Sequence, residues 1–369
     1  VGSEMCIRDR YHHAQPGDMA MDTQKMENTR NDAGTMKPVA IIILNWNGRA
    51  LLERFLPSVV EHSDPRISRV IVADNGSDDG SVEMLKDKFP TVEILPFDTN
   101  YGFAEGYNRA VAAVESEYTL LLNSDAAATP GWDVTLYDFM EEHPDAGACQ
   151  PKLLSYDHPD TFEYAGGCGG YIDCNGYPYC RGRIFSTCET DSGQYDSEAD
   201  IHWATGAALM VRRSVYLECG GLDTDFFAHM EEIDLCWRIR LAGWRICAVP
   251  DATVYHLGGG SLPAESPRKT YLNFRNNLLM LHKNLPDDVR GRILLRRRLL
   301  DTVAWAKYVA TLDWRNAAAI VRAHHDFARM RTRYATHPSA SLLGTGKSSR
   351  RNILTQDYLR GRKTFDKLK

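Results

Sequence analysis

Apolar runs alternate regularly with segments of helical periodicity between residues 38 and 143. Buried strands are predicted at 38–44, 69–74, 91–97 and 118–123, and amphipathic helices at 49–62, 80–89, 102–115 and 131–143. Strands followed one by one by helices are typical of right-handed βαβ units. The pattern therefore predicts an α/β fold whose mostly parallel central sheet is covered by helices on both faces.

The pattern changes after residue 150. The Gly, Tyr and Cys-rich stretch 157–200 predicts loops and short antiparallel strands, and 203–223 predicts a strand followed by a helix. We expect the following divisions: a disordered start (1–36), a main domain (37–270) with two halves (37–150 and 151–270), a helical extension (271–335) and a basic flexible tail (336–369).

The first ten residues, "VGSEMCIRDR", are expected to be an artefact of sequencing rather than part of the natural protein. The stretch Met5–Asp9 can be encoded by bases that resemble the end of a transposon adapter used in sequencing libraries. We therefore exclude residues 1–10 from the fold and expect the natural start at Met19, Met21 or Met36.

Polar residues follow the predicted strands at the edge where parallel sheets bind ligands. These segments are "NWNG" after the first strand, "DNGSDDGS" after the second and "NSDAA" after the fourth. Asn123 and Asp125 stand two apart on extended backbone, so both can face the same cleft. The alternative for Ser124 and its neighbours is an Asx turn that caps the next helix, and Ser77–Asp79 equally suits helix capping.

Composition narrows the class of protein. No apolar run reaches the ~18 residues of a membrane-spanning helix. The spacing of Cys168, Cys174, Cys180 and Cys188 does not match a zinc site, so we expect reduced thiols in a cytoplasmic protein. Residues 286–369 hold 19 Lys+Arg against 7 Asp+Glu, whereas the rest of the chain is acidic. A basic end on an acidic body indicates an anionic partner for that end.

Two nucleotide-binding folds lose support because their glycine loops are missing. The turn after the first strand, "LNWNGRALL", contains one glycine where a dinucleotide fold needs G-x-G-x-x-G, and the chain has no Walker A lysine loop.

Three acids in "FFAHMEEIDLCWR" lie among apolar residues. Glu231, Glu232 and Asp234 suit the first turn of a helix, where free backbone N–H groups favour negative charge. Asp234 and Arg238 stand four apart, so we expect them to pair on an exposed helix face. His256, before three glycines, is either a structural histidine or part of an element that closes a site.

Six motifs in order resemble family 2 glycosyltransferases, and their closest likeness is to the rhamnosyltransferase-like enzymes of bacterial surface polysaccharide synthesis. The motifs are "IIILNWNG", "VADNGSDDGS", "NYGFAEGYNRA", "LLLNSD", "EEIDLCWR" and "VYHLGGGS", within residues 38–280. The resemblance implies a GT-A fold, a Rossmann-like nucleotide-diphospho-sugar transferase fold, with the helical extension added at its C-terminal end. It also implies that residues 37–270 are the catalytic domain, with a nucleotide-sugar-binding half (37–150) and an acceptor-binding half (151–270).

The resemblance also assigns roles to residues. Trp46 would stack on the nucleotide base, and Asp74 would accept a hydrogen bond from an N–H group of that base. The metal would be held by Asp125, with Asn123 in place of the family's first acid and with His256. Glu232 would be the catalytic base, Glu231 its rival and Asp234 a supporting acid. The full nucleotide-sugar set is Asn45, Trp46, Asn47, Asp74, Asn75, Gly102, Asn108, Asn123, Ser124 and Asp125, and the acceptor set is Trp203, Thr205 and Gly206.

The implied reaction is a single inverting displacement that uses Mg²⁺ or Mn²⁺. The donor would be a dTDP- or UDP-sugar, with rhamnose as the sugar, and the acceptor a glycan or lipid-linked glycan; nucleic acid is not expected. The basic helices after residue 285 suit either peripheral contact with the inner face of the cytoplasmic membrane or packing on the catalytic domain. The rivals are a non-catalytic nucleotide-sugar or glycan binding protein on this fold and a glycoside hydrolase, which needs two acids facing each other across a cleft.

Overall fold

A computed structural model describes residues 36–258, 266–343 and 350–368. The expectations for residues 1–35, including the artefact at 1–10, lie outside these ranges.

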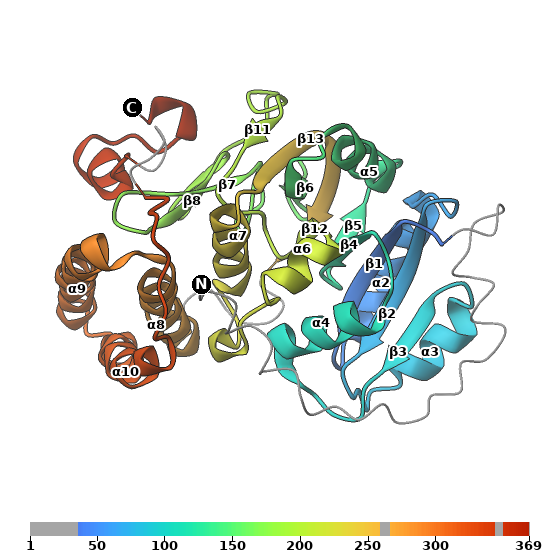
Figure 1. Ribbon diagram of the computed structural model, residues 1–369, viewed down its shortest axis with the longest axis horizontal. Helices are drawn as coiled ribbons and strands as arrows, with labels where there is room; N and C mark the ends of the chain where they lie inside the picture. Colours follow the sequence, from blue (N-terminus) through green and yellow to red (C-terminus); the bar gives the residue numbers. More distant parts are fainter. Residues whose placement is uncertain (1–35, 259–265, 344–349, 369) are drawn as a thin grey trace, which may run out of the picture.

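A mixed sheet forms the centre of the molecule, and the mostly parallel α/β fold is confirmed (Figure 1). The strand order among the described residues is β11-β13-β6-β12-β4-β1-β2-β3, and β5 pairs with β13. The parallel part consists of β1 (Val39–Asn45), β2 (Ser68–Asp74), β3 (Glu93–Pro96) and β4 (Tyr118–Leu122). The remaining strands are β5 (Ala126–Ala128), β6 (Ala146–Ser155), β11 (Ala199–Asp200), β12 (Ala208–Arg212) and β13 (Arg245–His256).

Helices cover both faces of this sheet, because successive side chains of a strand point to opposite sides. Ile41 and Ile43 of β1 belong to one buried core, and Ala40 and Ile42 to the other. The first core includes α2 (Arg49–His62), α3 (Ser81–Lys88) and α5 (Trp132–Glu142), and the second includes α4 (Gly102–Ala113), α6 (Arg213–Glu218) and α7 (Glu231–Leu241).

Strand β6 was not predicted, because its sequence "AGACQPKLLS" contains polar residues in its middle. Those polar residues are nevertheless buried and satisfied by distant partners. Gln150 Oε1 accepts from the Thr205 backbone N–H at 3.0 Å, and Lys152 forms ion pairs with Asp191 and Asp196. The strand before His256 is also longer than expected, because β13 pairs with β6 over most of its length.

A small antiparallel sheet follows the central one, as the 157–200 pattern predicts. Its order is β10-β9-β8-β7, formed by β7 (Gly170–Ile172), β8 (Pro178–Cys180), β9 (Arg183–Ile184) and β10 (Thr187–Cys188). The eight cysteines in the described part of the chain are all free thiols.

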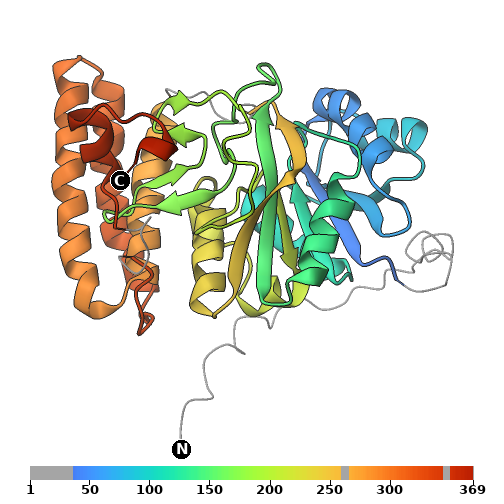
Figure 2. The ribbon, with the colours of Figure 1, turned by 90° about the horizontal axis from the view of Figure 1, so that it is seen from above.

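Three helices form the C-terminal extension at one end of the molecule (Figures 1 and 2). They are α8 (Pro267–Asn284), α9 (Asp287–Ala310) and α10 (Trp314–Met330). None of the helices that the structure describes is both long and apolar enough to cross a membrane.

Residues 350–368 differ from the flexible tail that the sequence suggests. Ile353 is fully buried and its backbone N–H donates to Asp173 Oδ2 at 3.1 Å. The Phe365 ring packs against Tyr171 and Tyr195, with ring centroids 5.1 and 5.8 Å away. Scattered aromatic and aliphatic residues thus attach this basic segment to the small sheet and its flanking loop.

Candidate functional site

The carboxyl ends of β1 and β2 form a first polar cluster. Asn45 Nδ2 donates to Asp74 Oδ1 at 3.0 Å, and the Ser77 backbone N–H donates to Asp74 Oδ2 at 3.0 Å. Each oxygen of Asp74 therefore keeps acceptor capacity, since an ionised carboxylate has about four lone-pair sites. The buried carboxylate is held in one orientation at the end of its strand.

The loop after β1 presents an aromatic ring beside this cluster. Trp46 is 58% exposed, although large aromatic side chains are usually highly buried. Asn47 fixes the loop by a reciprocal pair of hydrogen bonds with Asp78, at 2.8 and 2.9 Å. Trp46 is thus an exposed ring on a loop whose backbone is anchored.

Asn75 connects β2 to the start of α4. Its amide nitrogen donates to Asn100 Oδ1 at 3.0 Å and to the Gly102 carbonyl at 3.1 Å. Its amide oxygen accepts from the Tyr101 backbone N–H at 2.9 Å. Asn75 therefore shapes the turn in which Gly102 has a left-handed backbone (φ 79°).

A second polar cluster lies where β4 and β13 end. His256 Nε2 is 3.0 Å from Asp125 Oδ1 and 3.2 Å from Asn123 Nδ2, so the two residues that alternation places on one face do share a partner. On its other side, His256 Nδ1 is 3.3 Å from Glu163 Oε1. Glu163 was not predicted, because a single acid in a glycine-rich loop gives no signal in the sequence.

The charges of this cluster depend on one another. Burial lowers the pKa of His256, but hydrogen bonds and attraction to Asp125 and Glu163 outweigh burial and raise it to about 10. Burial raises the pKa of Asp125, but the hydrogen bond to His256 holds it below its ordinary value. The surroundings of His256 thus favour its protonated form, and the contact with His256 favours the ionised form of Asp125.

A divalent metal fits this cluster only if substrate oxygens complete its coordination. No three His, Cys, Asp or Glu side chains within residues 36–258, 266–343 and 350–368 are arranged to hold a metal ion by themselves. Hard cations such as Mg²⁺ are, however, often held by one or two carboxylates together with substrate phosphates. Asp125 fits that role, whereas His256 would have to release a proton before its ring nitrogen could bind a metal.

Glu232, the second residue of α7, lies beside Gly206. A Cβ built on Gly206 would be 3.5 Å from Glu232 Cβ and 3.9 Å from Phe103 Cζ, so these three residues are neighbours. The next residue, Ala207, accepts a hydrogen bond from the Asn123 backbone N–H at 3.0 Å. The segment 206–207 thus connects Glu232 to the second polar cluster.

The two adjacent glutamates differ in exposure. Glu232 is half-buried, and burial raises its pKa to about 7. Glu231 is 5% exposed, and burial, with the nearby charge of Glu232, raises its pKa well above the ordinary value. Burial thus favours the neutral form of both acids. Glu232 keeps partial exposure as a residue, although Oε2 of each side chain is buried and has no hydrogen-bond partner among the described residues.

The loop before α7 has an unusual backbone. Phe227, His229 and Met230 have φ values of 67°, 68° and 75°, a region that non-glycine residues rarely adopt. Two residues of α8 hold this loop. Arg275 donates to the carbonyls of Asp225 and Phe226, and Asn276 donates to the carbonyls of Phe226, Ala228 and His229. The backbone that leads into Glu231 and Glu232 is thus set by long-range contacts.

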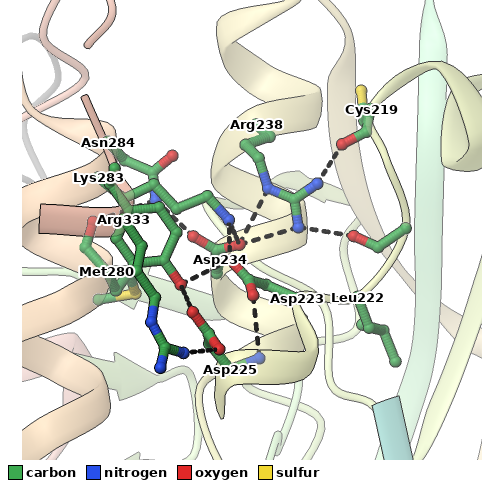
Figure 3. A network of polar contacts seen from close by, with 12 residues as sticks. Cys219, Leu222, Asp223, Asp225, Asp234, Arg238, Met280, Lys283, Asn284 and Arg333 are labelled. Carbon is green, nitrogen blue, oxygen red and sulfur yellow. Dashed lines mark hydrogen bonds and ion pairs between the residues drawn. The ribbon is translucent and has the colours of Figure 1, made fainter. Parts of the chain in front are cut away.

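Asp234 pairs with Arg238 as its spacing predicts, but inside the protein rather than on an exposed face (Figure 3). It is fully buried, and it also accepts from Lys283 at 2.8 Å and Asn284 at 2.7 Å. Lys283 in turn pairs with Asp223 at 2.6 Å. Asp234 therefore joins α7 to α8.

Replacing Asp234 by Asn is expected to destabilise the protein by about 2 kcal/mol at neutral pH, because hydrogen bonds to a charged group are lost while Lys283 and Arg238 stay partly buried. Burial opposes ionisation, but Lys283 and Arg238 hold the pKa of Asp234 below its ordinary value. The stabilisation is therefore complete above the unfolded pKa and lost as pH falls through the folded one. Urea unfolding of both proteins from pH 7 to pH 3 measures this; a constant difference would contradict it.

Other residues of the expected site lie within the framework. Trp203 is buried, and its indole N–H donates to the Tyr171 carbonyl at 2.9 Å. Asn108 joins α4 to the loop before η2 (Thr224–Phe226) by hydrogen bonds to the Leu222 backbone at 2.8 and 2.9 Å. Thr205 is buried against β6 through Gln150, and Ser124 is half-buried between Asn123 and Asp125.

Comparison with known proteins identifies the family and the fold. The model of the family described as "Glycosyl transferase family 2" matches residues 40–218. An N-acetylglucosaminyl-diphospho-decaprenol L-rhamnosyltransferase of Mycobacterium tuberculosis (strain ATCC 25618 / H37Rv) is 29% identical over 230 residues, which are 58% of this chain and 75% of that protein. Rhamnosyltransferase WbbL of Escherichia coli (strain K12) is 37% identical over 60 residues, 16% of this chain and 23% of that protein.

Two solved structures share the fold. S. aureus TarS 1-349 in complex with UDP-GlcNAc has a TM-score of 0.53 and 16% identity, and the match covers 79% of this chain and 81% of that chain. GalNAc-T7 with UDP, GalNAc and Mn²⁺ has a TM-score of 0.53 and 13% identity over 68% of this chain and 48% of that chain. The expected GT-A fold with a C-terminal helical extension is thereby confirmed, and the chain belongs to glycosyltransferase family 2.

Proposed function

We propose that this family 2 glycosyltransferase moves rhamnose from dTDP-rhamnose to a hydroxyl of a lipid-linked glycan, with inversion at the anomeric carbon. The main support is Glu232, a half-buried carboxylate with a pKa near 7 beside Gly206. A general base works best when its pKa lies near the working pH. The mycobacterial relative, an N-acetylglucosaminyl-diphospho-decaprenol L-rhamnosyltransferase, supports rhamnose as the sugar and a polyprenol-linked glycan as the acceptor.

The donor would lie across the two polar clusters at the carboxyl ends of β1, β2 and β4. Trp46 would stack on the base, and Asp74, oriented by Asn45, would accept a base N–H. The diphosphate would lie near Asp125. A divalent ion bound there with the substrate would neutralise charge on the diphosphate, and GalNAc-T7, a structure of the same fold, contains Mn²⁺ together with UDP.

Glu232 would take the proton of the acceptor hydroxyl. The acceptor oxygen then forms its bond to the anomeric carbon from the side opposite the diphosphate, and the bond from that carbon to the diphosphate oxygen breaks. The products are the extended glycan, the nucleoside diphosphate and protonated Glu232. Burial of Glu232 beside Gly206 and Phe103 favours the neutral form of the acid until substrate arrives.

The test is a transfer assay with purified protein. dTDP-rhamnose and UDP-GlcNAc are each mixed with an N-acetylglucosaminyl-diphospho-polyprenol, with Mn²⁺ or with a chelator. We expect metal-dependent release of dTDP from dTDP-rhamnose. Mass spectrometry should show the acceptor lipid extended by one rhamnose, and NMR should show that the configuration at the rhamnose anomeric carbon is inverted relative to the donor. Asp125→Asn should need more Mn²⁺, by at least the ~10–100-fold typical of losing a partner around a metal.

Two results would contradict the proposal. Donors that raise the melting temperature without any release of nucleoside diphosphate would indicate a non-catalytic binding protein. Cleavage of a glycan without a nucleotide-sugar would indicate a hydrolase.

A further inference from the structure

The outer face of α9 is apolar and uncovered. The inner face packs on the rest of the protein through the buried Ile293 and Leu294, Arg297 over the Tyr177 ring, and the ion pair of Asp301 with His324. On the other side, Leu295, Leu299 and Val303 are 60%, 62% and 69% exposed. Positions four apart lie on one side of a helix, so these three residues form a continuous stripe. In Figures 1 and 2, α9 lies at the end of the molecule farthest from β1–β3.

Positive charges flank this stripe. Arg292, Arg296, Arg298 and Lys307 are exposed, and no ion pair is found for any of them among the described residues. The only acid between residues 291 and 312 is Asp301, which is fully buried and paired with Arg297 and His324. The exposed face of α9 therefore combines apolar side chains with uncompensated positive charge.

The turn after α9 extends the apolar surface. Leu312 is 72% exposed and Trp314, the first residue of α10, is 60% exposed. Trp305, near the end of α9, is 38% exposed. Tryptophan has an apolar ring and one N–H donor, a combination enriched where a membrane meets water.

The positive charge on this face of α9 distinguishes two candidate partners, a second copy of the chain and a membrane surface. A second copy of the chain would place the stripe and its arginines against the same arginines, and like charges across an interface disfavour association. A membrane with anionic headgroups receives the apolar side chains between its lipids and pairs with the flanking cations. An anionic lipid surface is the better complement.

We propose that the outer face of α9, with Leu295, Leu299 and Val303 at its centre, docks the protein on the surface of an anionic membrane. The helix lies in the plane of the interface and does not cross it. This inference does not depend on the identity of the donor, the acceptor or the catalytic base. It does place the enzyme on the surface where a lipid-linked acceptor would be found.

The test is sedimentation of the full chain with vesicles. We expect binding to phosphatidylcholine vesicles that contain phosphatidylglycerol, weak binding to pure phosphatidylcholine, and release by salt, because exposed charges are screened. The triple variant Leu295→Gln/Leu299→Gln/Val303→Gln should lower the binding constant by about tenfold or more. The variant Arg292→Gln/Arg296→Gln/Lys307→Gln should lower it similarly and reduce its dependence on salt.

Two controls lie away from α9, one on α3 at the opposite end of the molecule and one on α6 in its middle (Figure 1). Lys86→Gln/Lys88→Gln removes exposed positive charges from α3, and Leu217→Gln removes an exposed apolar side chain from α6. Both should bind vesicles as the original protein does. Activity on a water-soluble acceptor should be unchanged in the α9 variants, so failure of the docking proposal is distinguishable from failure of the proposed reaction.

Three results would overturn the proposal. These are binding that does not depend on phosphatidylglycerol, equal losses in the α3 control and the α9 variants, and a dimer in solution that the apolar triple variant dissociates while vesicle binding persists. The last result would assign the face to a second copy of the chain. Circular dichroism and melting temperature confirm that each variant is folded.

Discussion

Replacing Glu232 by Gln is expected to lower kcat by about 10²–10⁴-fold, the usual contribution of a general base. Donor binding should change little, because Glu232 lies beside Gly206 rather than in either cluster at the strand ends. Glutamine keeps the size and the partial burial of the side chain but cannot accept a proton at neutral pH. Steady-state kinetics, with donor affinity from calorimetry, measures the two effects separately.

The pH dependence of the original protein gives an independent check. Burial raises the pKa of Glu232 to about 7, and a base acts only in its deprotonated form. Activity should therefore rise with pH through about 7 and fall by tenfold per pH unit below it. This fall in activity on the acidic side of the pH profile, the acid limb, should be absent from the residual activity of Glu232→Gln.

Glu231→Gln is the matched control. Glu231 is buried, and burial with the nearby charge of Glu232 raises its pKa, which favours the neutral acid, so an amide of nearly the same shape should replace it with little loss of kcat. The outcome that contradicts this assignment is the reverse pattern, in which Glu231→Gln is inactive and Glu232→Gln is not. That pattern would transfer the role of base to Glu231.

Local patterns predicted the framework because they depend on local physics. The strand and helix at the start of the domain were predicted within a residue of β1 and α2, since alternation of apolar and polar positions follows directly from strand and helix geometry. Strand β6 escaped prediction because Gln150 and Lys152 are buried by partners far away in the sequence. No window of ten residues contains that information.

Part of the side-chain geometry followed from the same local rules. The i, i+2 spacing of Asn123 and Asp125 predicted that both side chains face one way, and both contact His256. Glu163, on the other side of that histidine, and the exact surroundings of Asp234 depend on tertiary contacts. The spacing of Asp234 and Arg238 predicted their ion pair but could not indicate that Lys283 and Asn284 would bury it.

The backbone before the glutamates is the least predictable part of the site, and Asn276 controls it. Its amide nitrogen donates to three loop carbonyls at 2.7–2.9 Å, and its oxygen accepts from Arg275 Nε at 2.8 Å. Left-handed conformations at non-glycine residues cost roughly 1–3 kcal/mol each and persist only when their surroundings enforce them. Three such residues in this loop need that enforcement.

Asn276→Leu is therefore expected to lower the free energy of unfolding by about 3 kcal/mol, because buried carbonyls lose their donor. It should also lower kcat by about 10²-fold, with little change in donor KM, because Glu232 is displaced from the acceptor. A displaced Glu232 is more hydrated, so the acid limb of the pH profile should move to lower pH. Urea unfolding and pH-dependent kinetics measure these effects.

Asn277→Leu separates positioning from stability. Asn277 is the next residue of α8, is equally buried, and donates to the Gly176 carbonyl at 2.8 Å rather than to the loop before α7. Its loss should destabilise the protein but leave the acid limb in place. If both variants shift the limb, or neither does, Asn276 acts only on stability. If only Asn276→Leu shifts it, a single amide on α8 holds the strained backbone that presents Glu232 to the acceptor.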